Sequence, residues 1–245
     1  MCAGAWGMVW LAVQGVGTIL LAVVAALQDH IRGWVMGPKL DLEVRGEPPD
    51  RHRTPLETRV LEVDGQSGHV LGERIVSSAD CYYYRFRVLN RGRGTARNVE
   101  VYAAELSERQ ADGSFALVGS FLPMALVWSH RDGQPSSIDL HPGTWRFCDL
   151  GKVVDPAKRA SIPGEDSPRL GVPSDQAMLS LKVETPSTNR GHLLRPGTYR
   201  LTLRVSAANC AKPLTRGMEV SFPGEWFLEE RDMLGKGLGL KLLPL

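Results

Sequence analysis

Hydrophobic and polar residues alternate along residues 82–106, which predicts two β-strands around a glycine-rich turn. On the first strand, the apolar side chains that share one face are Tyr82, Tyr84, Phe86 and Val88. On the second strand, the apolar face is continued by Val99, Val101 and Ala103. Alternation with period two, carried by aromatic and β-branched residues, is typical of a half-buried strand. The glycines of Asn90–Gly94 favour a chain reversal, so we expect a central β-hairpin here.

Shorter alternating runs predict further strands on both sides of this hairpin. Before it, we expect a strand at Leu40–Val44, a polar loop at Gly46–Glu57, and a small hairpin formed by Arg59–Val63 and Gly68–Leu71. After it, the expected strands are Phe115–Leu122, Ile138–Leu140, Trp145–Leu150, Leu179–Val183, Leu201–Val205 and Met218–Phe222, and Ala125–Trp128 is either a strand or a helical turn. Residues 152–177 contain several prolines without periodicity, so they are predicted to form a long loop.

The central stretch resembles a known family of domains. The pattern Asn90-x-Gly92, Ala96, Val99-x-Val101 is similar to the hairpin of bacterial Ig-like sandwich domains, of which the cell-adhesion-related domain (CARDB) is an example. In addition, Gly197-x-Tyr199 resembles the tyrosine corner of Ig-like sandwiches, in which the tyrosine hydroxyl bonds back to upstream backbone. The resemblance implies an all-β, Ig-like antiparallel β-sandwich that binds or spaces other molecules, and it carries over no catalytic residue.

The N-terminal segment has a different composition. Residues 1–28 contain no charged side chain, and residues 5–27 are almost entirely apolar. As a helix, this run spans about 34 Å, which is enough for a hydrocarbon core of about 30 Å. It lacks a basic flank and is longer than the apolar region of a secretory signal, so we favour a retained single-pass transmembrane helix over a cleaved signal peptide.

Charges next to this segment predict its orientation. Arg32, Lys39 and Arg45 follow it closely, whereas no basic side chain precedes it. The positive-inside rule therefore predicts an anchor in the cell (inner) membrane of a bacterium, with the N-terminus outside and the C-terminal domain in the cytoplasm. We expect three regions: an anchor and interface at 1–34, the sandwich at 35–223, and a C-terminal tail at 224–245 that packs on the sandwich or is disordered.

The cysteines agree with a reducing compartment. Cys2, Cys81, Cys148 and Cys210 form no C-x-x-C pair, and free thiols are expected rather than a structural disulfide.

Composition and motifs narrow the candidate chemistry. The net charge of +2 gives no case for nucleic acid as a partner. The six histidines are scattered without metal-ligand spacing, and no nucleophile-elbow, phosphate-loop or dinucleotide-binding motif is present. The sequence therefore predicts no catalytic, cofactor-binding or metal-binding residue, and we expect a protein that is not an enzyme.

Two groups of residues are candidate binding sites. The first is a basic patch, which is either a solvated strand face or a surface for anions such as lipid headgroups: Arg85, Arg87, Arg91, Arg93 and Arg97. The second is a set of loop tryptophans that suit a sugar-binding groove: Trp128, Trp145 and Trp226. We therefore expect a membrane-anchored, non-enzymatic module that binds a protein partner, and the alternative is a carbohydrate-type ligand-binding sandwich. A coplanar, exposed pair of these tryptophans would favour the alternative.

Overall fold

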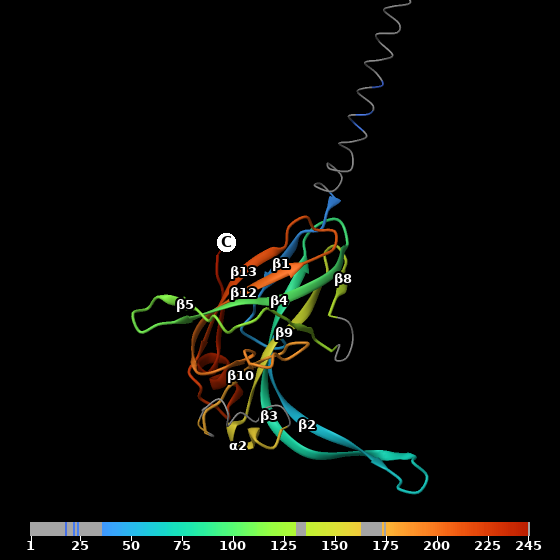
Figure 1. Ribbon diagram of the computed structural model, residues 1–245, viewed down its shortest axis with the longest axis vertical. Coiled ribbons are helices and arrows are strands. Elements are labelled where there is room, and N and C mark those ends of the chain that lie inside the picture. The colour runs from blue at the N-terminus through green and yellow to red at the C-terminus, as the bar shows by residue number, and fades with distance from the viewer. Residues whose placement is uncertain are drawn as a thin grey trace, which may run out of the picture.

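The computed structural model describes residues 36–130, 136–162, 173 and 175–244, together with the helical positions Thr18, Ala22 and Val24. These residues form an antiparallel, two-sheet β-sandwich (Figure 1). The predicted anchor at 1–34 lies outside the described residues apart from those three positions. Among the described residues, no helix combines the length and the apolar composition needed to cross a membrane.

The first sheet is built around the long strand β3 (Val70–Asn90). This strand pairs with β1 (Leu40–Glu43), β2 (Arg51–Val63) and β9 (Trp145–Val154). Strand β9 continues the sheet through β10 (Leu179–Leu181) to β11 (Leu193–Leu194), and β7 (Val127–Trp128) also pairs with β9.

The second sheet is built around β4 (Ala96–Arg109). This strand pairs with β12 (Gly197–Ser206), and β12 leads through β13 (Leu214–Phe222) to β14 (Gly239–Leu242). Three short strands also pair with β4, namely β5 (Phe115–Leu117), β6 (Met124–Ala125) and β8 (Ile138–Leu140).

The core lies between the two sheets, and the inward-facing residues predicted for three of its strands belong to it. The alternate residues of β3 from Tyr82 to Val88 are fully buried, as are Val99 and Ala103 of β4. The second sheet adds fully buried residues from β12, namely Leu201, Leu203 and Val205. Burial of these faces is the main source of stability, because each fully buried large apolar side chain contributes about 1.5–3 kcal/mol.

The predicted central hairpin is wrong: β3 and β4 belong to different sheets, so the connection between them is an arch across the sandwich. The turn between them bonds to the segment that leads into β1, where Arg91 N donates to Lys39 O and Arg93 N donates to Gly37 O. The backbone of Gly37 lies so close to Gly92 that a Cβ there would meet its carbonyl oxygen at 2.4 Å. Glycine is therefore needed here for close approach of another chain segment, and not for a hairpin reversal.

The predicted loop at Gly46–Glu57 is also wrong in its second half, where β2 begins at Arg51. The predicted small hairpin exists, but its strands are the outer ends of β2 and β3, and they extend beyond the sandwich (Figure 1). Pro55 misled the prediction, because proline is tolerated in an edge strand although it is excluded from a central one.

The remaining connections differ from the prediction in detail. The strand predicted at Phe115–Leu122 ends at Leu117, and Ala125–Trp128 contributes to two short strands, β6 and β7. Within the loop predicted at 152–177, β9 continues to Val154, and the short helix α2 (Pro156–Arg159) follows, with Asp155 accepting from Ala157 N at 3.0 Å.

The C-terminal residues are part of the sandwich, so the packed alternative for the tail is confirmed. They form α3 (Glu230–Asp232), the π-helix η2 (Met233–Gly237) and β14, and Met233 is fully buried. The last expected strand, Met218–Phe222, is therefore an interior strand covered by β14. The tyrosine corner is confirmed, because the Tyr199 hydroxyl donates to Arg195 O at 3.0 Å.

Candidate functional site

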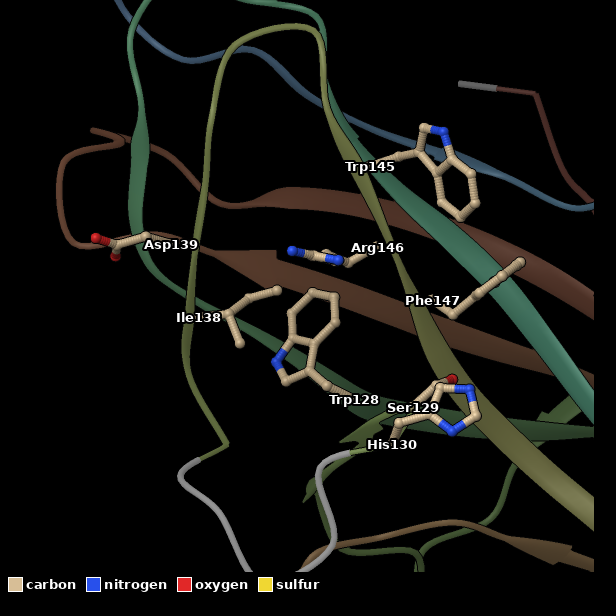
Figure 2. Close-up of a pocket in the computed structure, with 8 residues that line it drawn as sticks. All are labelled: Trp128, Ser129, His130, Ile138, Asp139, Trp145, Arg146 and Phe147. Atoms are coloured by element: carbon tan, nitrogen blue, oxygen red, sulfur yellow. The ribbon is translucent and has the colours of Figure 1, made fainter.

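Two of the three predicted tryptophans come together at a cleft beside β7, β8 and β9. The cleft has a volume of about 690 Å³, and the residues that line it are Trp128, Ser129, His130, Ile138, Asp139, Trp145, Arg146 and Phe147 (Figure 2). Figure 2 shows Trp145 and Phe147 on one side of β9 and Arg146 on the other, as strand alternation requires. The cleft therefore combines aromatic surface with a carboxylate, a guanidinium and an imidazole.

The tryptophans of the cleft do not form a coplanar pair. Trp128 is buried, and its indole N–H donates to Ser136 O at 2.6 Å. Trp145 is 42% exposed, and its ring meets Phe147 edge-on at 4.9 Å between centroids. The guanidinium carbon of Arg87 lies 4.3 Å from the centroid of Trp145, so a cation already occupies one face of that ring.

Trp226 lies away from this cleft. It is half-buried against the core, and its ring packs on Tyr82 at 5.0 Å with an interplanar angle of 56°. Its indole N–H is buried without a hydrogen-bond partner among the described residues. Trp226 is thus a packing residue between the tail and β3, and it does not line the groove expected from the sequence.

The predicted arginines do not form one open basic patch. Arg85 donates from Nε to Asp149 Oδ1 at 2.9 Å, and Arg87 donates from Nη2 to Asp50 Oδ1 at 2.7 Å. These arginine side chains are only 11% and 10% exposed. Both guanidinium groups also stack over Phe147, so their positions are fixed by carboxylates and rings.

The other three arginines lie around the arch. Arg91 pairs with Asp41 at 2.7 Å in an exposed ion pair. Arg93 and Arg97 are exposed, and the backbone N–H of Arg97 donates to Asn209 at 2.9 Å. Within the described part of the chain, carboxylates pair with Arg85, Arg87 and Arg91, and Arg93 and Arg97 have no ion pair there.

Two titratable groups, on β2 and on β9, have shifted pKa values with identifiable causes. Burial and the nearby Arg85 lower the pKa of His52, whose ring stacks on Tyr83 at 5.9 Å. Burial raises the pKa of the Cys148 thiol well above its usual value. Both groups are therefore held neutral near pH 7. Among the described residues, Cys148 and Cys210 are free thiols, as predicted, the Cys81 thiol donates to Thr54 O at 3.3 Å, and Cys2 lies outside the described residues.

A second candidate surface, which the sequence analysis did not identify, is the arm. We define the arm as residues 54–63 of β2, residues 70–79 of β3 and the turn between them. It projects from the sandwich at the end opposite the start of β1 (Figure 1). Most of the exposed large aliphatic residues of the described chain lie on it: Val60, Leu61, Val63, Val70, Leu71, Ile75 and Val76.

The base of the arm is fixed to the sandwich. A separate buried cluster joins the arm to β9 and to the segment after α2, and it consists of Ala79, Cys81, Val154 and Ile162, with Leu56 and Tyr83 packed against it. On the arm itself, Arg59 pairs with Glu57 at 2.7 Å and with Glu73 at 3.4 Å, and Arg74 pairs with Glu62 at 3.1 Å. These exposed pairs add little stability, since each contributes about 0–1 kcal/mol.

The long edges of the arm are unpaired within the described part of the chain. Strand β2 pairs only with β3, and β9 pairs with β3 from Cys81 onward, which is beyond the arm. A two-stranded ribbon is only marginally stable alone in water, and an exposed edge is a template for pairing with another strand. The adjacent apolar residues Val60-Leu61, Val70-Leu71 and Ile75-Val76 were the available signal in the sequence, but their exposure depends on where the second sheet ends.

Comparisons of the chain with protein-family models, with curated proteins and with solved structures found no match. By its sheet topology, this protein belongs to the class of antiparallel β-sandwiches, and it carries a projecting arm. Among the described residues, no group of three or more His, Cys, Asp and Glu side chains has a metal-binding arrangement.

Proposed function

We propose that this protein is a membrane-anchored, non-enzymatic interaction module, and that the arm is the element that binds a protein partner. In this proposal, the apolar residues 5–27 span the cell membrane and the Ig-like sandwich lies in the cytoplasm. The membrane is then the first partner, and a protein is the second. The proposal assigns no role to a cofactor or to nucleic acid.

The observation that supports this function best is the combination of exposed aliphatic residues and unpaired edges on the arm. Leu61, Leu71 and Val70 are 60% or more exposed. Large exposed apolar patches are rare on soluble monomers, and where they occur they mark interaction sites. The arm also points away from the end of the sandwich at which β1 begins (Figure 1). In an anchored protein, it would extend away from the bilayer.

The test is affinity purification of the full-length chain from detergent extracts, compared with a variant whose arm is shortened. Thr58 and Ser77 are cross-strand partners, so replacing Arg59–Val76 with Asn-Gly closes the hairpin at that pair with a favoured turn. The core and the base cluster remain intact in this variant. We expect a protein that co-purifies with the parent chain to be absent with the shortened arm. If the parent chain and the shortened variant captured the same protein equally, at equal melting temperature, the arm would be excluded as the binding element.

A second candidate function is supported by the cleft, which places Trp128, Trp145 and Phe147 near Asp139 and Arg146. Aromatic rings beside polar groups are the usual composition of a small-ligand pocket, including one for sugars. A glycan array probed with the parent chain and with Trp145→Ala tests this alternative. Trp226→Phe serves as the control, because Trp226 lies outside the cleft. Binding that depends on Trp145 alone would favour the carbohydrate-type function.

A further inference from the structure

We infer that the partner bound by the outer edge of β2 is β2 of a second copy of this chain, paired antiparallel with Thr58 opposite Thr58 of the partner subunit. This inference rests on the proposed function, because it names the protein that the arm binds.

The outward-facing backbone groups of β2 are identified by two observations. The N–H of Arg53 donates to the carboxylate of Glu230 at 2.9 Å, so it does not face β3. Pro55, two residues further along, has no N–H to donate. Because successive residues alternate in direction, the odd-numbered residues of β2 direct their N–H and C=O groups outward. The two register shifts between β2 and β3 are bulges on β3, where Val76 and Leu71 have no partner on β2. The extra residues are therefore on β3, and the alternation along β2 continues without interruption.

Symmetry restricts how two copies of this edge can pair. Two identical antiparallel strands are related by a two-fold axis perpendicular to the sheet, and such an axis leaves each side chain on its own face. Residues that oppose each other must then point to the same face. Every allowed register is therefore centred on one residue, which opposes itself.

The charges of the arm select one of these registers. A centre at Glu57 or at Arg59 places like charges opposite each other, and a centre at Val60 places Arg59 opposite Leu61 of the partner subunit. A centre at Thr58 instead places Glu57 opposite Arg59 of the partner subunit, twice by symmetry. In the same register, Leu56 opposes Val60 of the partner subunit. Of these four centres, only Thr58 places Glu57 opposite Arg59 of the partner subunit and Leu56 opposite Val60 of the partner subunit.

The backbone suits this register as well. Glu57 and Arg59 both have outward-facing groups, so each Glu57–Arg59 pair exchanges two hydrogen bonds across the interface. Pro55 opposes Leu61 of the partner subunit, and it needs only its carbonyl oxygen to accept from that N–H. The exposed Leu228 lies beside Arg53, whose Nη1 donates to Leu228 O at 2.9 Å. Val63 of the partner subunit opposes Arg53 in this register, so Leu228 lies next to Val63 of the partner subunit.

The first test is disulfide trapping of the full-length chain in mild detergent, with Cys2 and Cys210 replaced by Ser. Thr58→Cys places the new thiols in a non-hydrogen-bonded pair, whose Cα atoms are about 4.5 Å apart and within disulfide range. We expect mild oxidation to give a covalent dimer with Thr58→Cys. The control is Ile75→Cys, which is in the same arm but on β3, and we expect it to remain monomeric.

The second test is a charge exchange measured by analytical ultracentrifugation. E57R or R59E alone should weaken the dimer about tenfold or more, because two attractive pairs become repulsive. The double variant E57R/R59E should restore it. R74E, which alters the arm charge on β3 at a residue that pairs with Glu62 and not with Glu57 or Arg59, is the matched control and should leave the dimer unchanged.

A monomeric parent chain, equal trapping with Thr58→Cys and Ile75→Cys, or a double variant no tighter than the single ones would overturn this inference. If the monomeric chain still captured another protein through its arm, the proposed function would stand without the self-association. Restored dimerisation in the double variant also shows that the single variants did not simply unfold.

Discussion

Arg87 and Asp50 form an ion pair that joins the C-terminal part of β3 to the residue just before β2. Arg87 donates from Nη2 and Nε to Asp50 Oδ1 at 2.7 and 3.2 Å, and Asp50 is fully buried. Asp50 O also accepts from Arg85 N at 2.8 Å. The start of the arm-bearing strand is therefore fixed by a side-chain contact and a backbone contact of the same residue.

Removing one member of this pair should destabilise the fold strongly. Asp50→Ala leaves the Arg87 guanidinium buried without its carboxylate, and we expect a loss of about 3–5 kcal/mol in the free energy of unfolding. Urea denaturation measures this loss. Arg91→Ala is the control, because the Arg91–Asp41 pair is exposed and should cost about 1 kcal/mol or less. Equal effects of the two substitutions would contradict the role given to Asp50.

Truncation of Phe86 tests the assignment of the core face of β3. Phe86 is fully buried between the sheets, so Phe86→Ala should cost about 3–5 kcal/mol. Leu71→Ala, at an exposed position on the same strand, should stay within about 0.5 kcal/mol. Both values come from equilibrium unfolding monitored by tryptophan fluorescence. A loss below about 1 kcal/mol for Phe86→Ala would mean that the faces are assigned the wrong way round.

Alkaline pH should destabilise the fold through its buried tyrosines. Burial raises the pKa of Tyr199 to about 12 from the usual value of 10.0, and burial also raises the pKa values of Tyr82 and Tyr84. Above pH 10 the unfolded chain releases protons that the folded chain keeps. The stabilisation is therefore complete below pH 10 and is lost as the pH rises through 12.

The measurement is the urea midpoint as a function of pH in the parent chain and in Tyr199→Phe. The variant loses one hydrogen bond, at a cost of about 0.5–1.5 kcal/mol at neutral pH. Its stability should then fall less steeply than that of the parent chain between pH 10 and 12. Parallel curves would show that Tyr199 titrates with an ordinary pKa in the folded state.

The predicted topology can be tested with a C-terminal fusion to a phosphatase that is active only outside the cytoplasm. The positive charges after the apolar segment predict a cytoplasmic sandwich, so we expect little activity from this fusion. A reporter that is active only in the cytoplasm is the matched control. Strong phosphatase activity would place the sandwich outside and would reverse the predicted orientation. Release of the protein from membranes by alkaline carbonate would exclude an integral anchor.

The candidate sites were only partly predictable from the sequence. Of the three tryptophans grouped from the sequence, Trp128 and Trp145 line one cleft, whereas Trp226 packs on Tyr82. Arg85 and Arg87 were assigned to the outer face, but their carboxylate partners, Asp149 and Asp50, are 64 and 37 residues away in the chain. Pairings at such separations depend on strand neighbours, which alternation does not specify.

The alternation of apolar residues determined, without any structural information, which faces of Tyr82–Val88, Val99–Ala103 and Leu201–Val205 are buried. It did so because a strand with one dry face shows the same period of two wherever that strand lies. For the same reason, alternation does not distinguish a hairpin from an arch. Only the tertiary structure decided that β3 and β4 lie in opposite sheets, because the segment at Gly37–Lys39 takes the hydrogen bonds of the turn. The exposure of the aliphatic residues of the arm was also decided only by the tertiary structure. These side chains are exposed because the second sheet ends before it reaches the arm.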